Sequence, residues 1–136
     1  MELDLIYKYL LLSYFVLIFL KKIVNINSFS EKLIKLNYAD GYKISLILTI
    51  YLAFALVLVL FSDAENRYPK YMKIGNKMGR LGIILLILYT IVSTYNFHNV
   101  FANIQNLDIF FMNISIIGGL FILYKYYSVH IYCKEN

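Results

Sequence analysis

Long apolar runs, separated by short clusters of charged residues, organise the chain. Residues 44–61, 81–97 and 109–124 carry no charged side chain, and residues 5–20 carry only Lys8. At about 1.5 Å of rise per residue, a helix over 44–61 reaches about 27 Å, close to the thickness of the hydrocarbon core of a bilayer. The pattern therefore predicts four transmembrane helices, at about residues 5–20, 44–61, 81–97 and 109–127. We expect them to form an all-α transmembrane four-helix bundle, a single integral membrane domain over residues 1–136.

Composition supports a membrane protein over a soluble bundle. The chain is 61% hydrophobic and 15% charged, whereas soluble domains carry roughly 25% charged residues. A buried helix of a soluble bundle normally keeps a polar stripe, and residues 44–61 show none. A cleaved signal peptide is the alternative for residues 5–20, but Glu2 and Asp4 replace the usual basic start. The single cysteine, Cys133, permits no internal disulfide.

A short amphipathic helix is predicted between the first and second spans. Ser28 and Glu31 fit the S-x-x-E pattern of a capping box, which satisfies free amide groups at a helix start. Phe29, Leu33 and Leu36 then fall on one helical face. We expect this helix to lie in the membrane interface and to end within residues 37–41.

The distribution of lysine and arginine predicts the orientation. With four spans, eight basic residues lie on the side of the termini and five on the other side. Basic residues prefer the cytoplasm, so we place both termini and the 62–80 loop there. Gly75 and Gly79 of that loop are expected at turns or helix ends. The net charge of +5 is attributed to topology, and no nucleic-acid partner is expected.

Small and polar residues within the spans predict the faces on which helices meet, because lipid offers no hydrogen bonds. Residues of this kind recur at about one-turn spacing on three spans: Ser45, Thr49 and Ala53; Thr90 and Thr94; Ser115, Gly118 and Gly119. Asn113 lies on the opposite side of the last helix from Ser115. We therefore expect that helix to have partners on two sides, through a central position or an oligomer contact.

His98, Asn99 and Asn113 are the polar intramembrane candidates. They stand where the third span ends and the fourth begins, and we expect His98 to pair with Asn113 across a turn at residues 99–108. Two roles for His98 are open: a structural hydrogen bond, or proton handling and quinone contact, since histidine titrates near neutral pH. No metal site is expected, because His130, the other histidine, falls on the opposite side of the membrane. No catalytic residue is assigned.

The motifs of the last two spans resemble those of a known family. Phe97-His98-Asn99 is followed by a polar turn over 103–108, by Asn113 and by Gly118-Gly119-Leu120. With the four spans and the amphipathic segment, this resembles the DoxX family of small four-helix integral membrane proteins. The family's Gly before Lys in helix 1 is absent at Phe19-Leu20-Lys21-Lys22, and its Glu-Gly-Gly of helix 2 is absent at residues 51–56. Relatives implied by the resemblance include a small subunit of a thiosulfate:quinone oxidoreductase, partners in oxidative-stress complexes and chaperones of membrane proteins.

Three functions follow as expectations. The first is a non-catalytic subunit or assembly partner of a membrane complex, a respiratory or redox complex among the candidates, with a protein partner or a second copy of the chain in the bilayer. The second is a quinone-interacting redox component, with a quinone as the cofactor near His98 and Asn113. The third, a small-molecule carrier or channel, ranks last because four short helices enclose little polar volume.

Overall fold

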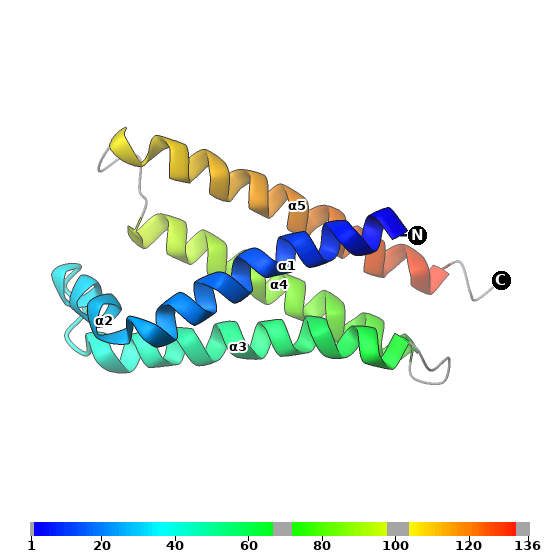
Figure 1. Cartoon of the computed structure of the whole chain (residues 1–136), viewed down its shortest axis with the longest axis horizontal. Coiled ribbons are helices and arrows are strands. Elements are labelled where there is room, and N and C mark those ends of the chain that lie inside the picture. The colour runs from blue at the N-terminus through cyan, green and yellow to red at the C-terminus, as the bar shows by residue number, and fades with distance from the viewer. Residues whose placement is uncertain (1, 67–71, 98–103, 133–136) are drawn as a thin grey trace. The chain divides into compact units, whose positions relative to one another are not determined.

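The computed structural model describes residues 2–66, 72–97 and 104–132 (Figure 1). These residues form five α-helices and one 3-10 turn: α1 (Glu2–Val24), α2 (Ile26–Lys35), α3 (Gly41–Asn66), α4 (Met72–Phe97), η2 (Ile104–Asn106) and α5 (Leu107–Tyr132). The prediction of an all-α fold is confirmed.

Within the described residues, three segments are long and apolar enough to cross a membrane: Gly41–Ser62, Lys73–Phe97 and Ile104–Tyr127. Residues of α1 and α2 pass the same criterion only together, and the two helices are bent by 88° at their junction. The structure therefore indicates an integral membrane protein with three candidate spans, or four if the bent pair is one span. The four-helix transmembrane bundle stays a prediction.

The helices extend well beyond the charge-free runs. α3 continues to Asn66 and α4 begins at Met72, so most of the loop expected at residues 62–80 is helical and that expectation was wrong. Lysine and arginine are good helix formers, so a charge ends the part of a helix that suits hydrocarbon without ending the helix. Gly79 accordingly lies inside α4 and not at a turn or a helix end.

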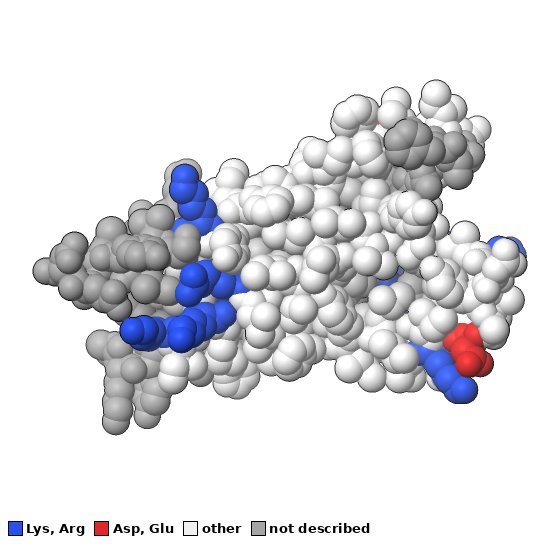
Figure 2. Space-filling view, turned by 180° about the vertical axis from the view of Figure 1, so that it is seen from behind, with Lys and Arg blue, Asp and Glu red and all other residues white. Residues whose placement is uncertain are grey.

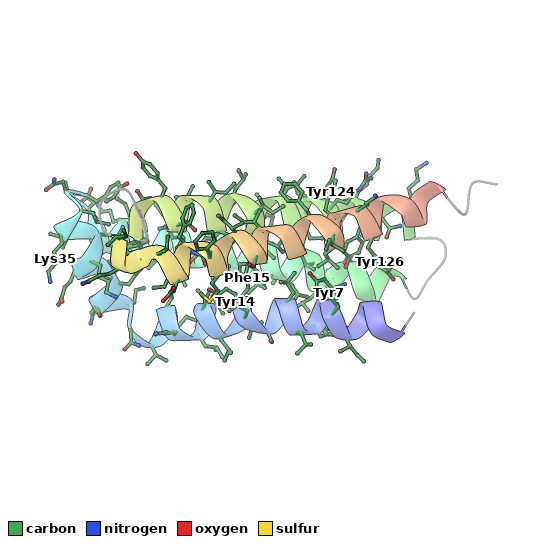
Figure 3. All side chains as sticks on the ribbon, turned by 90° about the horizontal axis from the view of Figure 1, so that it is seen from above. Tyr7, Tyr14, Phe15, Lys35, Tyr124 and Tyr126 are labelled. Atoms are coloured by element: carbon green, nitrogen blue, oxygen red, sulfur yellow. The ribbon has the colours of Figure 1, made fainter. Side chains whose placement is uncertain are left out.

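The chain divides by its internal contacts into two compact units, Met1–Leu56 and Val57–Asn136, and the boundary falls within α3. The first unit contains α1, α2 and the first part of α3. Tyr14 and Phe15 of α1 lie with their rings edge to face, 5.5 Å between centroids (Figure 3). The single integral membrane domain expected from the sequence stays a prediction.

The elbow between α1 and α2 forms at Asn25. α2 begins at Ile26 after Asn25, whose side chain makes no capping hydrogen bond. Ser28 therefore lies inside the helix, and the predicted capping box was wrong. Across the elbow, the Lys22 Nζ atom lies 3.8 Å from the centroid of the Phe29 ring, a cation–π contact. Such a contact helps to hold the bend between the two helices.

The turn from α2 to α3 is tight and falls where it was predicted. Asn37 has φ of 67°, a left-handed conformation that asparagine tolerates better than most residues. The Asn37 and Tyr38 amides donate to the carbonyl oxygens of Ile34 and Leu33. A Cβ atom on Gly41 would lie 2.6 Å from the Ser30 carbonyl oxygen, so glycine permits the start of α3 to touch α2.

Burial along α2 follows the predicted amphipathic pattern only in part, because Leu36, expected on the same apolar face as Leu33, is 42% exposed. Leu33 and Ser30 are buried, whereas Glu31, Lys32 and Lys35 are exposed. The location of α2 in a membrane interface stays a prediction.

In the second unit, α4 and α5 pack against each other as an antiparallel pair (Figure 1). Ile83, Leu86 and Leu120 are fully buried. Tyr124 and Tyr126 project from opposite sides of α5 (Figure 3). The α4–α5 pair positions the polar side chains of Thr94, Asn113 and Tyr127.

Candidate functional site

The contact between α4 and α5 follows a seven-residue repeat on α5. Asn113, Leu120 and Tyr127 are separated by seven residues each, and their exposed fractions are 6%, 0% and 1%. Such spacing keeps one face of a helix turned toward a partner helix. We call the contact along these three residues the α4–α5 seam. Leu120 lies at its middle, and the polar side chains of Asn113 and Tyr127 lie toward its two ends.

Asn113 forms the first polar contact of the seam. Its Nδ2 donates to the Oγ1 atom of Thr94 on α4 at 2.9 Å. The Thr94 hydroxyl donates to the Thr90 carbonyl oxygen at 2.7 Å, and the Thr90 hydroxyl donates to the Leu86 carbonyl oxygen at 2.8 Å. Each threonine hydroxyl thus donates its hydrogen to the backbone of α4. The Thr94 oxygen can therefore accept the hydrogen bond from the Asn113 side-chain amide.

The bond between Asn113 and Thr94 joins α5 to α4 among buried side chains. Asn113, Thr94 and Thr90 are all buried. Hydrogen bonds between helices in a membrane contribute about 0.6 kcal/mol on average and up to about 1.7 kcal/mol. A side-chain amide offers two N–H donors and one acceptor oxygen, and the bond to Thr94 uses one donor. The geometry assigns Asn113 and Thr94 to joining α4 and α5, whereas the Thr90 hydroxyl bonds to the backbone of its own helix.

A second polar contact joins α3 and α5 beside α4, and the sequence analysis did not predict it. The Oγ atom of Ser62, on α3, lies 2.9 Å from the hydroxyl oxygen of Tyr127 on α5. Ser62 donates its own hydrogen to the Val59 carbonyl oxygen at 2.6 Å, so the Tyr127 hydroxyl is the donor to Ser62. Both residues are fully buried.

Gly79 on α4 completes this second contact. A Cβ atom at Gly79 would lie 2.8 Å from the Tyr127 Cε1 atom and 3.0 Å from the Ser62 Oγ atom. Only a residue without a Cβ lets the tyrosine ring lie against α4. The seven-residue spacing from Asn113 to Tyr127 indicates that Tyr127 lies on the packed face of α5. Its partners Ser62 and Gly79 were not predicted, because residues 62–80 were interpreted as a loop.

The stripe predicted on α3 is largely buried. Ser45 and Thr49 are buried, and Ala53 is half-buried. Ser45 donates to the Tyr42 carbonyl oxygen at 2.9 Å, and Thr49 donates to the Ser45 carbonyl oxygen at 2.7 Å. The two hydroxyls are thus satisfied within α3.

The small residues predicted on the last span differ from one another. Gly119 is buried, whereas Ser115 is exposed and donates to the Phe111 carbonyl oxygen at 3.0 Å. A Cβ atom at Gly118 would meet no heavy atom within 4 Å. The structure brings Asn113 and Thr94 together but leaves Ser115 and Gly118 on an open face. A helix contact at these two positions stays a prediction.

His98 and Asn99 lie outside the described residues. The partner that the structure gives to Asn113 is Thr94, one helical turn before His98. Pairing of Asn113 with His98 therefore stays a prediction. Among the side chains that the structure describes, no three of histidine, cysteine, aspartate or glutamate come together as a group that could hold a metal ion.

Comparisons with known proteins add no identification. The chain matches no protein-family model, no curated protein and no solved structure.

Proposed function

We propose that the chain is a multi-pass membrane protein of the DoxX-like type that acts as a non-catalytic subunit or assembly partner of a membrane complex. In this proposal α1, α3, α4 and α5 cross the bilayer as a four-helix bundle, α2 lies in the interface, and both termini are cytoplasmic. A respiratory or redox complex is the class that the family resemblance favours.

One observation carries the proposal: α5 has a face packed on α4 and a second face that is open. The packed face holds Asn113, Leu120 and Tyr127. The open face holds Gly118, Ser115 and several exposed apolar side chains, namely Phe111, Ile114, Phe121 and Ile122. Small residues on such a face permit close approach of another transmembrane helix. We assign this open face of α5 to a helix of the partner protein.

The use of the polar side chains supports the same proposal. Thr90, Thr94 and Asn113 bond to one another or to backbone carbonyl oxygens of α4. Ser62 and Tyr127 bond to each other in the same way. The bonds of Asn113 to Thr94 and of Tyr127 to Ser62 hold helices together, as polar side chains do between membrane helices.

Purification of the tagged full chain from its native membranes in a mild detergent, followed by native mass spectrometry, tests the proposal. The wild type should retain one membrane protein in fixed stoichiometry. Gly118→Leu should lose that protein because the added side chain keeps the partner helix away. Ile122→Leu, a volume-conserving change on the same face, should retain it. A wild-type chain found only as a monomer, or a partner retained by Gly118→Leu, would overturn the proposal.

A quinone-interacting redox component is the second candidate. It is favoured by the buried amide of Asn113, which lies at the same end of the α4–α5 pair as Phe97, the residue before His98. In this alternative His98 and Asn113 contact the quinone headgroup. Labelling of the chain by a photoreactive quinone should then fall in His98→Ala, together with any redox phenotype. Unchanged labelling and phenotype would eliminate this candidate.

A further inference from the structure

Basic side chains cluster at the end of the second unit where α4 begins. Lys73, Lys77 and Arg80 follow one another at spacings of four and three residues, which places them on one face of α4. Figure 2 shows lysine and arginine side chains gathered at one end, beside the grey residues. We call Lys73, Lys77 and Arg80 the basic cluster.

One N–H group of Arg80 lacks a hydrogen-bond acceptor among the described residues. Its Nε atom is buried and has no hydrogen-bond partner among the described residues. Neither Arg80 nor Lys77 forms an ion pair with a described side chain. A buried N–H of a charged group without an acceptor is costly, so the site favours an anion that can supply oxygen atoms.

The surface next to the cluster is apolar and continues along the same face of α4. Arg80 directly precedes the charge-free run of residues 81–97. Leu81, Ile84 and Leu88 then repeat at helical spacing with 41–49% of their surface exposed. A molecule that places an anionic group at Arg80 can therefore lay a hydrocarbon chain along this ridge of α4.

We propose that the basic cluster binds the phosphate of an anionic phospholipid, whose acyl chain lies along Leu81, Ile84 and Leu88. The Arg80 side chain turns toward the phosphate, so that its buried Nε–H gains an oxygen acceptor, and Lys77 adds a second positive charge. A planar guanidinium suits phosphate because it presents several donors in a fixed geometry. The adjoining apolar ridge identifies the ligand as a lipid, since a free phosphate ion would make no use of it. This site is independent of the partner-binding function proposed above.

The test is a native mass spectrometry titration of the full chain in a neutral detergent. The probes are phosphatidylglycerol and phosphatidylcholine with identical acyl chains. Wild type should bind phosphatidylglycerol at least about fivefold more tightly, because each basic residue near a lipid headgroup contributes on the order of a fivefold effect. Equal affinity for the two lipids would overturn the proposal.

Three variants separate a headgroup site from simple charge. Arg80→Lys keeps the net charge, and hence the topology signal, but removes the Nε donor; it should lose most of the preference. Lys77→Gln removes a charge from an exposed position and should weaken phosphatidylglycerol binding about fivefold. Lys43→Gln, an exposed lysine paired with Asp40 at the start of α3, is the matched control and should bind like wild type.

Two outcomes would contradict a lipid site at the basic cluster. If Arg80→Lys and Lys77→Gln both keep the wild-type preference, the basic cluster does not bind the headgroup. If excess inorganic phosphate displaces the lipid completely, the site recognises a free anion and the assignment to a lipid is wrong. Retention of the lipid in excess phosphate supports it.

Discussion

The side-chain amide of Asn113 donates a hydrogen bond to the hydroxyl oxygen of Thr94, 2.9 Å away on the neighbouring helix. This bond fastens the beginning of α5 to the end of α4. Toward the other end of the same seam, Tyr127 donates to Ser62. Asn113 and Tyr127 are 14 residues apart (127 − 113), about 21 Å along a helix, which is shorter than a hydrocarbon core of about 30 Å. The first polar contact thus joins α5 to α4, and the second joins α5 to α3 beside Gly79 of α4.

Asn113→Leu should destabilise the α4–α5 pair by about 0.6–1.7 kcal/mol, because the interhelical bond is lost while the Thr94 hydroxyl keeps its bond to the Thr90 carbonyl oxygen. A double-mutant cycle with Thr94→Val should give a coupling energy in the same range. Reversible unfolding of the purified chain in mixed detergent micelles measures both values.

The control for this cycle is Ser115→Ala, on the same helix but exposed. Its change in unfolding free energy should stay within about 0.5 kcal/mol. A coupling energy near zero between positions 94 and 113 would show that the observed hydrogen bond contributes nothing to the register of the helices.

Gly79→Ala should destabilise the second unit by about 1–3 kcal/mol, the usual cost of overpacking. The new methyl group would lie 2.8 Å from the Tyr127 ring, and the ring is buried. Gly118→Ala provides the matched control, because its methyl group would meet no atom within 4 Å. Equal unfolding free energies for the two alanine variants would contradict the close contact at Gly79.

Tyr127→Phe should have a smaller effect than Gly79→Ala, near the average of about 0.6 kcal/mol for a hydrogen bond between membrane helices. The ring remains packed against Gly79, and Ser62 keeps its bond to the Val59 carbonyl oxygen. The same unfolding measurement tests this ranking. A larger loss in Tyr127→Phe than in Gly79→Ala would mean that the hydroxyl, and not the ring, holds the three helices together.

Gly41→Ala should open the turn between α2 and α3. The added methyl group would lie 2.6 Å from the Ser30 carbonyl oxygen and 2.7 Å from the Ile34 Cγ1 atom, and a backbone atom cannot rotate away as a side chain can. Hydrogen exchange should accelerate at the Asn37 and Tyr38 amides, which close α2. Asn37→Gly is the control: glycine adopts a φ of 67° readily, so exchange of the Tyr38 amide should stay slow. Unchanged exchange in Gly41→Ala would refute the tight turn.

The sequence predicted the apolar spans and one side of the seam well. Charge-free runs located the hydrocarbon parts of α3, α4 and α5 because charged side chains are excluded from lipid. Helical periodicity grouped Thr90 with Thr94 and placed Asn113 on the opposite side of its helix from Ser115. The partner of Asn113 was harder to predict, because helical spacing places both Thr94 and His98 on the expected face, one turn apart, and only the offset between the helices selects one of them.

The remaining features depend on facts that a linear pattern does not contain. The ends of α3 and α4 were misplaced because lysine, arginine and asparagine lie within these helices, and a charged or polar residue does not by itself end a helix. The bond between Ser62 and Tyr127 joins residues 65 positions apart, and its geometry rests on the close approach at Gly79. Such a contact follows from packing in three dimensions, which the spacing of residues within one helix does not reveal.

Site-specific photo-crosslinking in native membranes tests the central claim, that this chain is an assembly partner, most directly. A photoreactive residue replaces Ile122 on the open face of α5, and the same residue replaces the buried Leu120 as the control. The account predicts that the Ile122 probe yields one reproducible adduct with an identified membrane protein, while the Leu120 probe yields only products of monomer size. An Ile122 probe that gives only monomer or lipid adducts under every growth condition would contradict it.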